Sequence, residues 1–243
     1  MSLTTYRCHG THILYDTQRL AQPDDPTLPP PGPAWLEPAA WQARGLVTGS
    51  APGRGDSLFL QVAEQAWVVR PYRRGGMAAR VSRARYVWPG RERTRAFREL
   101  RLTRTLHARG LPVPAPVAAL VIHHGATYRG ALITVRLPQT QALETRLETA
   151  SPALLAEVGR TIRRFHDAGL DHVDLNARNV LIDADDRVWL IDFDRCRLRR
   201  QGAWRERNLA RLARSLERFA PARAASLYQA LRDGYQADAA ASG

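Results

Sequence analysis

Two short stretches in the second half of the chain decide its fold. Residues 172–179 have the sequence HVDLNARN, and residues 191–194 have the sequence IDFD. In this arrangement Asn179 follows Asp174 by five positions and Asp192 follows it by eighteen. The sequence therefore spaces four side chains at fixed intervals: a histidine, an acid, an amide, and a second acid at the end of an apolar run.

This spacing resembles that of protein kinases, which use H-R-D-x-x-x-x-N followed by D-F-G. Apolar runs at 180–183 and 188–191 predict two short strands joined by a polar turn, so a hairpin fills the interval between the motifs. A single H-x-D-x-x-x-x-N could equally be a group of acidic turn residues between helices. The hairpin and the second acid favour phosphoryl transfer over that reading.

Phosphoryl transfer depends on positioning and on charge stabilisation, and this assigns a role to each residue. We expect Asp174 to orient the acceptor hydroxyl and to accept its proton. Asn179 and Asp192 offer the hard oxygen ligands that suit a Mg²⁺ ion bound to the phosphates of ATP. His172 is expected to hold the loop near Asp192. Phe193 and Asp194, which follow Asp192 directly, are expected to be structural residues beside the site.

The first half of the chain should supply the groups that bind the phosphates. Gly53, Arg54 and Gly55 lie between two predicted strands, where a glycine-rich phosphate loop belongs, although two glycines in a turn are a weak signal. The next strand ends in Arg70, at the position where kinases usually have lysine. A guanidinium can pair with phosphate, but with a geometry different from that of an ammonium group.

The arginine at this position needs an acidic partner on the long helix that follows. Glu99 is the preferred partner because Phe97 and Leu100 place it near the buried face, and Glu92 is the competitor. We therefore predict an ion pair between Arg70 and Glu99.

Apolar periodicity and turn residues predict the remaining elements. Strands are expected at 11–16, 46–62, 67–71, 117–122 and 131–137, and helices at 37–43, 91–109, 151–168, 205–219 and 222–237, with a proline-rich loop at 23–38. The fold class is α+β, a bilobal protein-kinase-like fold. Residues 1–137 would form a strand-rich lobe with one long helix, and residues 138–243 a helical lobe.

Two departures from protein kinases narrow the acceptor. Asp194 stands where D-F-G has glycine, and no A-P-E-like segment follows it. The chain therefore lacks an ordinary activation segment and a platform for docking a peptide. This argues for a small or lipid-linked hydroxyl acceptor.

Four stretches resemble the 3-deoxy-D-manno-octulosonic acid (Kdo) kinases of the lipopolysaccharide kinase group of Gram-negative bacteria. They are WVVRPYRRGG at 67–76, TRAFRE at 94–99, GLPVPAP at 110–116 and DLNARN at 174–179. The resemblance covers roughly residues 53–197, and residues 1–45 resemble no family that we can name. It implies ATP as phosphate donor and the 4-hydroxyl of Kdo on a lipid A precursor as acceptor, at the cytoplasmic side of the inner membrane. The resemblance also implies that members of this family tend to have arginine at the position of Arg70.

Sequence chemistry alone leaves two alternatives open. One is a heptose kinase or another small-molecule kinase of the same fold. The other is a catalytically silent pseudokinase that binds nucleotide, which the missing lysine favours and the retention of Asp174, Asn179 and Asp192 opposes.

The charge of the chain is unusual. All 36 basic residues are arginine, and the formal net charge is +13. Residues 70–109 contain 13 arginines against Glu92 and Glu99. Given the resemblance, we expect this patch to dock on the anionic membrane surface. The members that we would test are Arg73, Arg74, Arg80, Arg83 and Arg85.

A second arginine cluster, residues 195–218, is more naturally a solvated helix face. No nucleic acid is expected as a partner, because the chain has no recognisable binding motif and no basic–aromatic alternation. No apolar run approaches the roughly 18 residues that span a bilayer, and residues 1–10 have no signal-peptide core. Cys8 and Cys196 have no metal-ligand or redox spacing, so we expect two reduced thiols.

Overall fold

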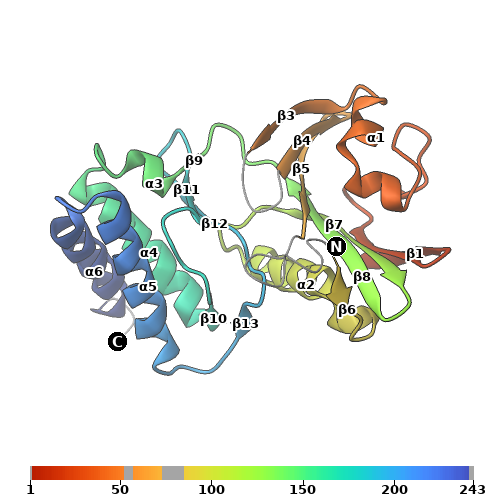
Figure 1. Ribbon diagram of the computed structural model, residues 1–243. Helices are drawn as coiled ribbons and strands as arrows, with labels where there is room; N and C mark the ends of the chain where they lie inside the picture. Colours follow the sequence, from red (N-terminus) through yellow and green to blue (C-terminus); the bar gives the residue numbers. More distant parts are fainter. Residues whose placement is uncertain (1, 52–56, 73–84, 241–243) are drawn as a thin grey trace. The chain divides into compact units, whose positions relative to one another are not determined.

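The structure, a computed structural model, describes residues 2–51, 57–72 and 85–240 (Figure 1). The chain forms two compact units. The first extends to Arg104 and includes Ala115–Arg136, and the second consists of Thr105–Pro114 and the chain from Leu137 onward. Residues 105–114, which the expected boundary at residue 137 assigns to the N-terminal lobe, thus belong to the helical unit.

An antiparallel eight-stranded sheet dominates the first unit. Its order is β1-β2-β7-β8-β5-β4-β3, and β6 pairs with the first two residues of β8. The strands are β1 (Leu3–Cys8), β2 (Thr11–Asp16), β3 (Val47–Ala51), β4 (Ser57–Val62), β5 (Gln65–Pro71), β6 (Tyr86–Val87), β7 (Pro116–His124) and β8 (Thr127–Val135). All of the strands expected from the sequence are present. The edge strand β1 was not expected, because its half-exposed residues have no apolar face.

Successive residues of the sheet point into two separate cores, as the period of a strand requires. Ile13 and Leu120 belong to one cluster of buried side chains, and their neighbours Leu14 and Val121 belong to the other. Both faces of the sheet are therefore covered.

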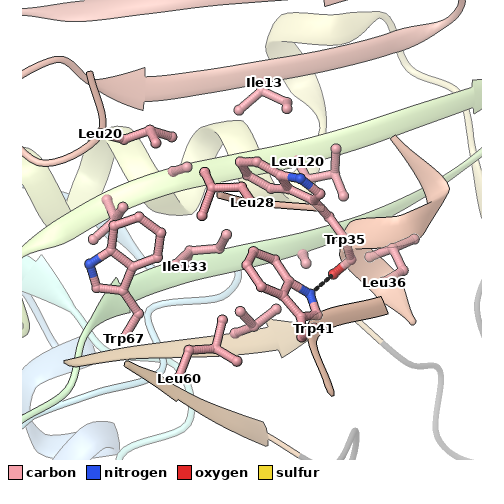
Figure 2. Close-up of a cluster of buried hydrophobic side chains, with 14 of the residues drawn as sticks. Ile13, Leu20, Leu28, Trp35, Leu36, Trp41, Leu60, Trp67, Leu120 and Ile133 are labelled. Carbon is pink, nitrogen blue, oxygen red and sulfur yellow. Dashed lines mark hydrogen bonds between the residues drawn. The ribbon is translucent and has the colours of Figure 1, made fainter. Parts of the chain in front are cut away.

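The first face is covered by the segment between β2 and β3 (Figure 2). Trp35 and Trp41 are almost fully buried in it against the sheet. The Trp41 indole N–H donates to the carbonyl of Trp35 (3.1 Å), and the Trp35 indole N–H donates to the carbonyl of Pro29 (2.9 Å). These bonds satisfy both indoles inside an apolar core. The proline-rich stretch is thus a packed cover that contains a 3₁₀ turn, Pro33–Leu36, and the short helix α1, Pro38–Gln42.

The second face is covered by α2 (Arg95–Ala108). The expected helical start at residue 91 is wrong, because Arg91–Arg93 form a 3₁₀ turn and Thr94 is extended. Phe97 and Leu100 are fully buried as expected, and so is Leu106, whereas Leu102 is only half-buried. The polar residue beside it, Thr103, is on the buried face instead, with 1% exposure.

The second unit is mainly helical. Its elements are α3 (Leu143–Arg146), α4 (Pro152–Asp167), α5 (Trp204–Phe219), α6 (Ala224–Ala240), β9 (Gln141–Ala142), β10 (Leu170–Asp171), β11 (Val180–Ile182), β12 (Val188–Leu190) and β13 (Arg197–Leu198). The predicted start of α4 is confirmed, since the Ser151 hydroxyl accepts the Leu154 N–H (3.1 Å) and Pro152 is the first helical residue. Gly169, with a φ of 86°, follows the end of α4.

Two glycines let α4 and α6 approach to backbone contact. A Cβ atom on Gly159 would lie 2.0 Å from the Leu231 carbonyl oxygen, and one on Gly234 would lie 2.0 Å from the Ala156 oxygen. Neither position can hold a larger side chain without separating the two helices.

A strand-rich unit thus precedes a helical one along most of the chain, and the expected α+β class is confirmed. None of the helices in the described part of the chain has both the length and the apolar character that crossing a bilayer requires.

Candidate active site

The loop between β10 and β11 carries the predicted catalytic residues. It is folded on itself, because the Leu175 N–H donates to the His172 carbonyl (3.1 Å) and the Asn179 N–H to the Asn176 carbonyl (3.0 Å). The Asn179 side-chain N–H₂ donates to the backbone carbonyl of Asp174 (2.9 Å). Asp174 is half-buried and Asn179 is 9% exposed. This bond fixes the amide and leaves its Oδ1 as the end that can accept a cation.

His172 connects this loop to the residue before Asp192. Its side chain is buried, and Nε2–H donates to the carbonyl of Ile191 (3.0 Å). Burial lowers the pKa of His172, so the imidazole is neutral. The Ile191 N–H in turn donates to the Asn179 carbonyl (3.0 Å). These bonds connect the HVDLNARN loop to the strand end that carries Asp192, as the role expected for His172 requires.

The residues after Asp192 turn sharply. Asp192 and Arg195 both have a φ of 63°, which is uncommon for non-glycine residues, and the Cys196 N–H donates to the Phe193 carbonyl (3.0 Å). Phe193 is buried, with its ring 5.5 Å from that of His172. Asp194 is half-buried in this turn. The chain then enters β13 directly, so no long segment intervenes between the IDFD motif and the next element.

Sequence reasoning missed two residues of α5 that hold the catalytic loop. Asn208 Oδ1 accepts the backbone N–H of His172 (2.9 Å), and Ser215 Oγ accepts that of Ala177 (2.9 Å). They are seven positions apart, which places them on one face of the helix. Both are buried, at 4% and 8% exposure. Buried polar residues on the apolar face of a predicted helix were the signal that could have identified them.

Asn208 also joins the loop to a buried carboxylate. Its Nδ2 donates to Oδ1 of Asp171 (3.1 Å), and Arg199 Nη1 donates to Oδ2 of the same residue (3.0 Å). Asp171 is 5% exposed, so these donors are what allow its charge to be buried. The residue immediately before His172 is thereby fixed.

In the first unit Arg70 and Glu99 form the predicted ion pair. Arg70 Nη2 contacts Glu99 Oε1, and the Tyr72 hydroxyl donates to Glu99 Oε2. The Glu99 side chain is 1% exposed and that of Arg70 is 29% exposed. The competitor Glu92 is on the surface, where it pairs with Arg91 (2.8 Å) and with Arg101.

Some expected residues lie outside the described part of the chain. These are Gly53, Arg54 and Gly55 of the phosphate loop and Arg73, Arg74, Arg80 and Arg83 of the arginine patch. Among the residues that the structure does describe, Arg70 and Glu99 belong to the first unit. Asp174, Asn179 and Asp192 belong to the second.

In the described ranges no three or more His, Cys, Asp or Glu side chains gather in a way that could hold a metal ion. A group of that kind is what a structural zinc ion requires. Magnesium has a different requirement, since one or two protein oxygens and the phosphates of a nucleotide usually hold it. Asn179 Oδ1 and the Asp192 carboxylate fit that requirement.

Comparison with known proteins identifies the class. The chain belongs to the lipopolysaccharide kinase (Kdo/WaaP) family, whose model matches residues 38–235. The matched range contains every predicted site residue.

Within this family the chain is similar to proteins named 3-deoxy-D-manno-octulosonic acid kinase. It is 48% identical to the one from Xanthomonas campestris pv. campestris over 220 residues, which cover 88% of this chain and 84% of the relative. It is 44% identical to the one from Stenotrophomonas maltophilia over 206 residues, covering 84% and 79%. Among solved structures it matches the Cydia pomonella granulovirus kinase PK-1 with a TM-score of 0.42 and 10% identity, covering 63% of this chain and 52% of that one.

Proposed function

We propose that this chain is an ATP-dependent kinase that phosphorylates the 4-hydroxyl of Kdo on a Kdo-bearing lipid A precursor. The observation that carries the proposal is the membership of the family together with relatives, up to 48% identical over most of the chain, that are named Kdo kinases. The folded loop that holds Asp174 and Asn179, tied through Ile191 to Asp192, supports the chemistry.

In this proposal Asp174 orients the acceptor hydroxyl and accepts its proton as the oxygen attacks the γ-phosphate. Asn179 Oδ1 and the Asp192 carboxylate hold Mg²⁺, which would neutralise charge on the ATP phosphates. Arg70, oriented by Glu99, binds the phosphates in the first unit. Residues 53–55 are assigned to the same task from the sequence.

We further propose that the protein works as a peripheral protein at the cytoplasmic face of the inner membrane. The arginine surplus at 70–109 supports this, and Arg85, Arg93 and Arg98 are exposed members of it. A variant with Arg85, Arg93 and Arg98 changed to glutamine should bind vesicles that contain anionic lipid more weakly than the wild type at moderate salt. Equal binding would exclude this docking surface.

The substrate is tested with purified protein, Mg·ATP and three acceptors in parallel: the Kdo-bearing lipid A precursor, a heptosylated core and soluble Kdo. Mass spectrometry of the products should show a gain of one phosphate on the Kdo of the precursor. Fragmentation or NMR of that product locates the phosphate, with the 4-position expected. Transfer only to the heptosylated core would contradict the proposed substrate and retain the kinase class.

A further inference from the structure

A strongly basic segment follows the IDFD motif directly. Residues 195–200 have the sequence RCRLRR, and its four arginines are exposed. Leu198, in their midst, has 38% exposure and is one of two exposed large hydrophobic residues in the described ranges. The sequence suggested a solvated helix face here, but this segment lies before α5, in and around β13.

The backbone of this segment is fixed against the start of the catalytic loop. β13 lies beside β10 (Figure 1) and pairs with it, and in this pairing Arg197 is opposite Asp171 and Leu198 is opposite Leu170. The Arg199 N–H donates to the Gly169 carbonyl (2.7 Å). A Cβ atom on Gly169 would lie 2.7 Å from the Arg199 oxygen, so this contact requires glycine. Arg197 therefore belongs to the short strand β13, which starts directly after Cys196 and pairs with Asp171, three residues before Asp174, and Arg199 is fixed by its bond to Gly169.

The charge of this segment is not balanced locally. The Asp171 carboxylate, which lies 3.0 Å from Arg199 Nη1 and 3.9 Å from Arg197 Nε, serves both arginines. No carboxylate in the described part of the chain lies within ion-pair distance of Arg195 or Arg200. Residues 195–205 contain no Asp or Glu. A net positive surface therefore lies beside the loop that carries Asp174.

We propose that residues 195–200 bind the phosphate groups of the phosphorylated glycolipid acceptor. This inference rests on the proposed function and names the surface that recognises the substrate. Guanidinium groups pair with phosphate through two parallel hydrogen bonds, and Arg195 and Arg200 have the exposure for such contacts. Leu198 supplies an apolar contact between them, as an amphiphilic acceptor requires. The short turn at 193–196 puts this strand in the sequence position where protein kinases have the peptide-binding segment.

The test uses a double variant, Arg195→Asn with Arg200→Gln. Asparagine suits position 195 because it tolerates the left-handed backbone there, at a φ of 63°. We expect the KM for the precursor to rise about thirtyfold, from two lost arginine–phosphate contacts, with less than a twofold change in the KM for ATP. For a precursor that lacks its lipid A phosphates, the KM of the wild type should be higher than for the intact precursor. The KM of the variant should differ little between the two precursors.

The matched control is Arg211→Gln with Arg214→Gln, which removes the same charge from exposed positions on α5. If both double variants raise the KM for the precursor equally, the effect is one of net charge and the proposal is wrong. If the first variant instead loses binding to anionic vesicles without acceptor, the partner is the bulk membrane, and this also overturns it. If the wild type transfers no phosphate, the two double variants can still be compared by their direct binding of the precursor in the absence of ATP. Failure of the proposed kinase function can therefore be distinguished from failure of the proposed phosphate-binding surface.

Discussion

The Tyr72 hydroxyl donates to one oxygen of the Glu99 carboxylate while Arg70 contacts the other. Tyr72 is the second residue after Arg70, and it extends the sheet through a bond from its N–H to the Gly130 carbonyl (2.9 Å). The guanidinium carbon of Arg95 lies 5.3 Å from the centre of its ring. Glu99 is thus oriented by a residue on the same strand segment as Arg70, in a place that water reaches little.

Replacing Tyr72 by phenylalanine removes only this hydroxyl. Because a buried carboxylate then loses a hydrogen-bond donor, we expect kcat/KM for ATP to fall about tenfold, with a smaller change in the KM for the acceptor. Glu99→Gln should cause a larger loss. Steady-state kinetics with each substrate varied in turn checks this, and Tyr228→Phe on α6 is the control. A loss of thermal stability without a change in the ATP parameters would mean that Tyr72 has only a packing role.

The two α5 residues that hold the catalytic loop provide a second test. Asn208→Asp keeps the acceptor for the His172 N–H but faces Asp171 with a second acceptor in place of a donor. We expect kcat to fall about tenfold as the loop shifts, with the KM for ATP less affected. Ser215→Ala should give a smaller loss in the same direction, and Ser215→Thr should restore activity. Ser226→Ala, on the exposed face of α6, should have no effect on kcat. Failure of threonine to restore activity would argue against a role for the hydroxyl.

Asp174→Ala tests the proposed general base directly. Removal of a general base in this position should lower kcat about 10³-fold. The dissociation constant for ATP, measured by titration of a fluorescent analogue, should change by less than twofold, since the proposed metal ligands Asn179 and Asp192 remain. Asp185→Ala, in the exposed turn between β11 and β12, is the matched control. Unchanged turnover in Asp174→Ala would exclude the proposed mechanism.

His166 should make stability depend on pH. Burial lowers its pKa from 6.5 to about 3, and its Nδ1 bonds the Tyr235 hydroxyl (2.8 Å). Between these values the unfolded chain binds a proton that the folded chain does not, so stability falls as pH falls, by about 1 kcal/mol per pH unit. Urea unfolding at pH 7.5 and 5.0 should show this loss, and His166→Gln should reduce the slope. The exposed His124→Gln should retain it, and equal slopes in both variants would assign the dependence to other groups.

Gly159→Ala should destabilise the helical unit, although alanine is the better helix former by about 1 kcal/mol. The added Cβ would lie 2.0 Å from the Leu231 carbonyl oxygen, so α4 and α6 must separate. We expect a loss of about 3 kcal/mol in the free energy of unfolding, at the upper end of overpacking effects. Gly202→Ala, where the nearest atom is 3.5 Å away, should have little effect. A stabilised Gly159→Ala would show that the two helices are not in backbone contact.

Local signals were sufficient for much of this protein. Spacing alone placed Asp174, Asn179 and Asp192 on one loop and one strand end, because the hairpin between them is coded by apolar runs and a polar turn. Apolar periodicity and turn residues predicted a helix at 151–168, close to the observed α4, and Glu99 was preferred over Glu92 because its neighbours are apolar. Each of these depends on residues close together in the chain.

Other features depend on residues far apart in the chain, and only the tertiary structure decided them. On α2 the polar Thr103 is buried and the apolar Leu102 is only half-buried. The position of the sheet, and not the apolar pattern of the helix, decides which side of α2 is covered. The proline-rich stretch packs on one face of the sheet. It can do so because the buried indoles of Trp35 and Trp41 donate hydrogen bonds to backbone carbonyls within it. Asn208 holds the loop between β10 and β11 by accepting the N–H of His172, which is 36 residues away in sequence.

The sequence by itself therefore determined which side chains the loop and the strand end carry, since motif spacing fixes which side chains a short loop can present. The tertiary structure decided what holds that loop and what lies beside it. Buried polar atoms must find partners wherever the chain brings them, and β13 places the exposed Arg197 opposite Asp171 of β10 through backbone pairing that no local pattern encodes.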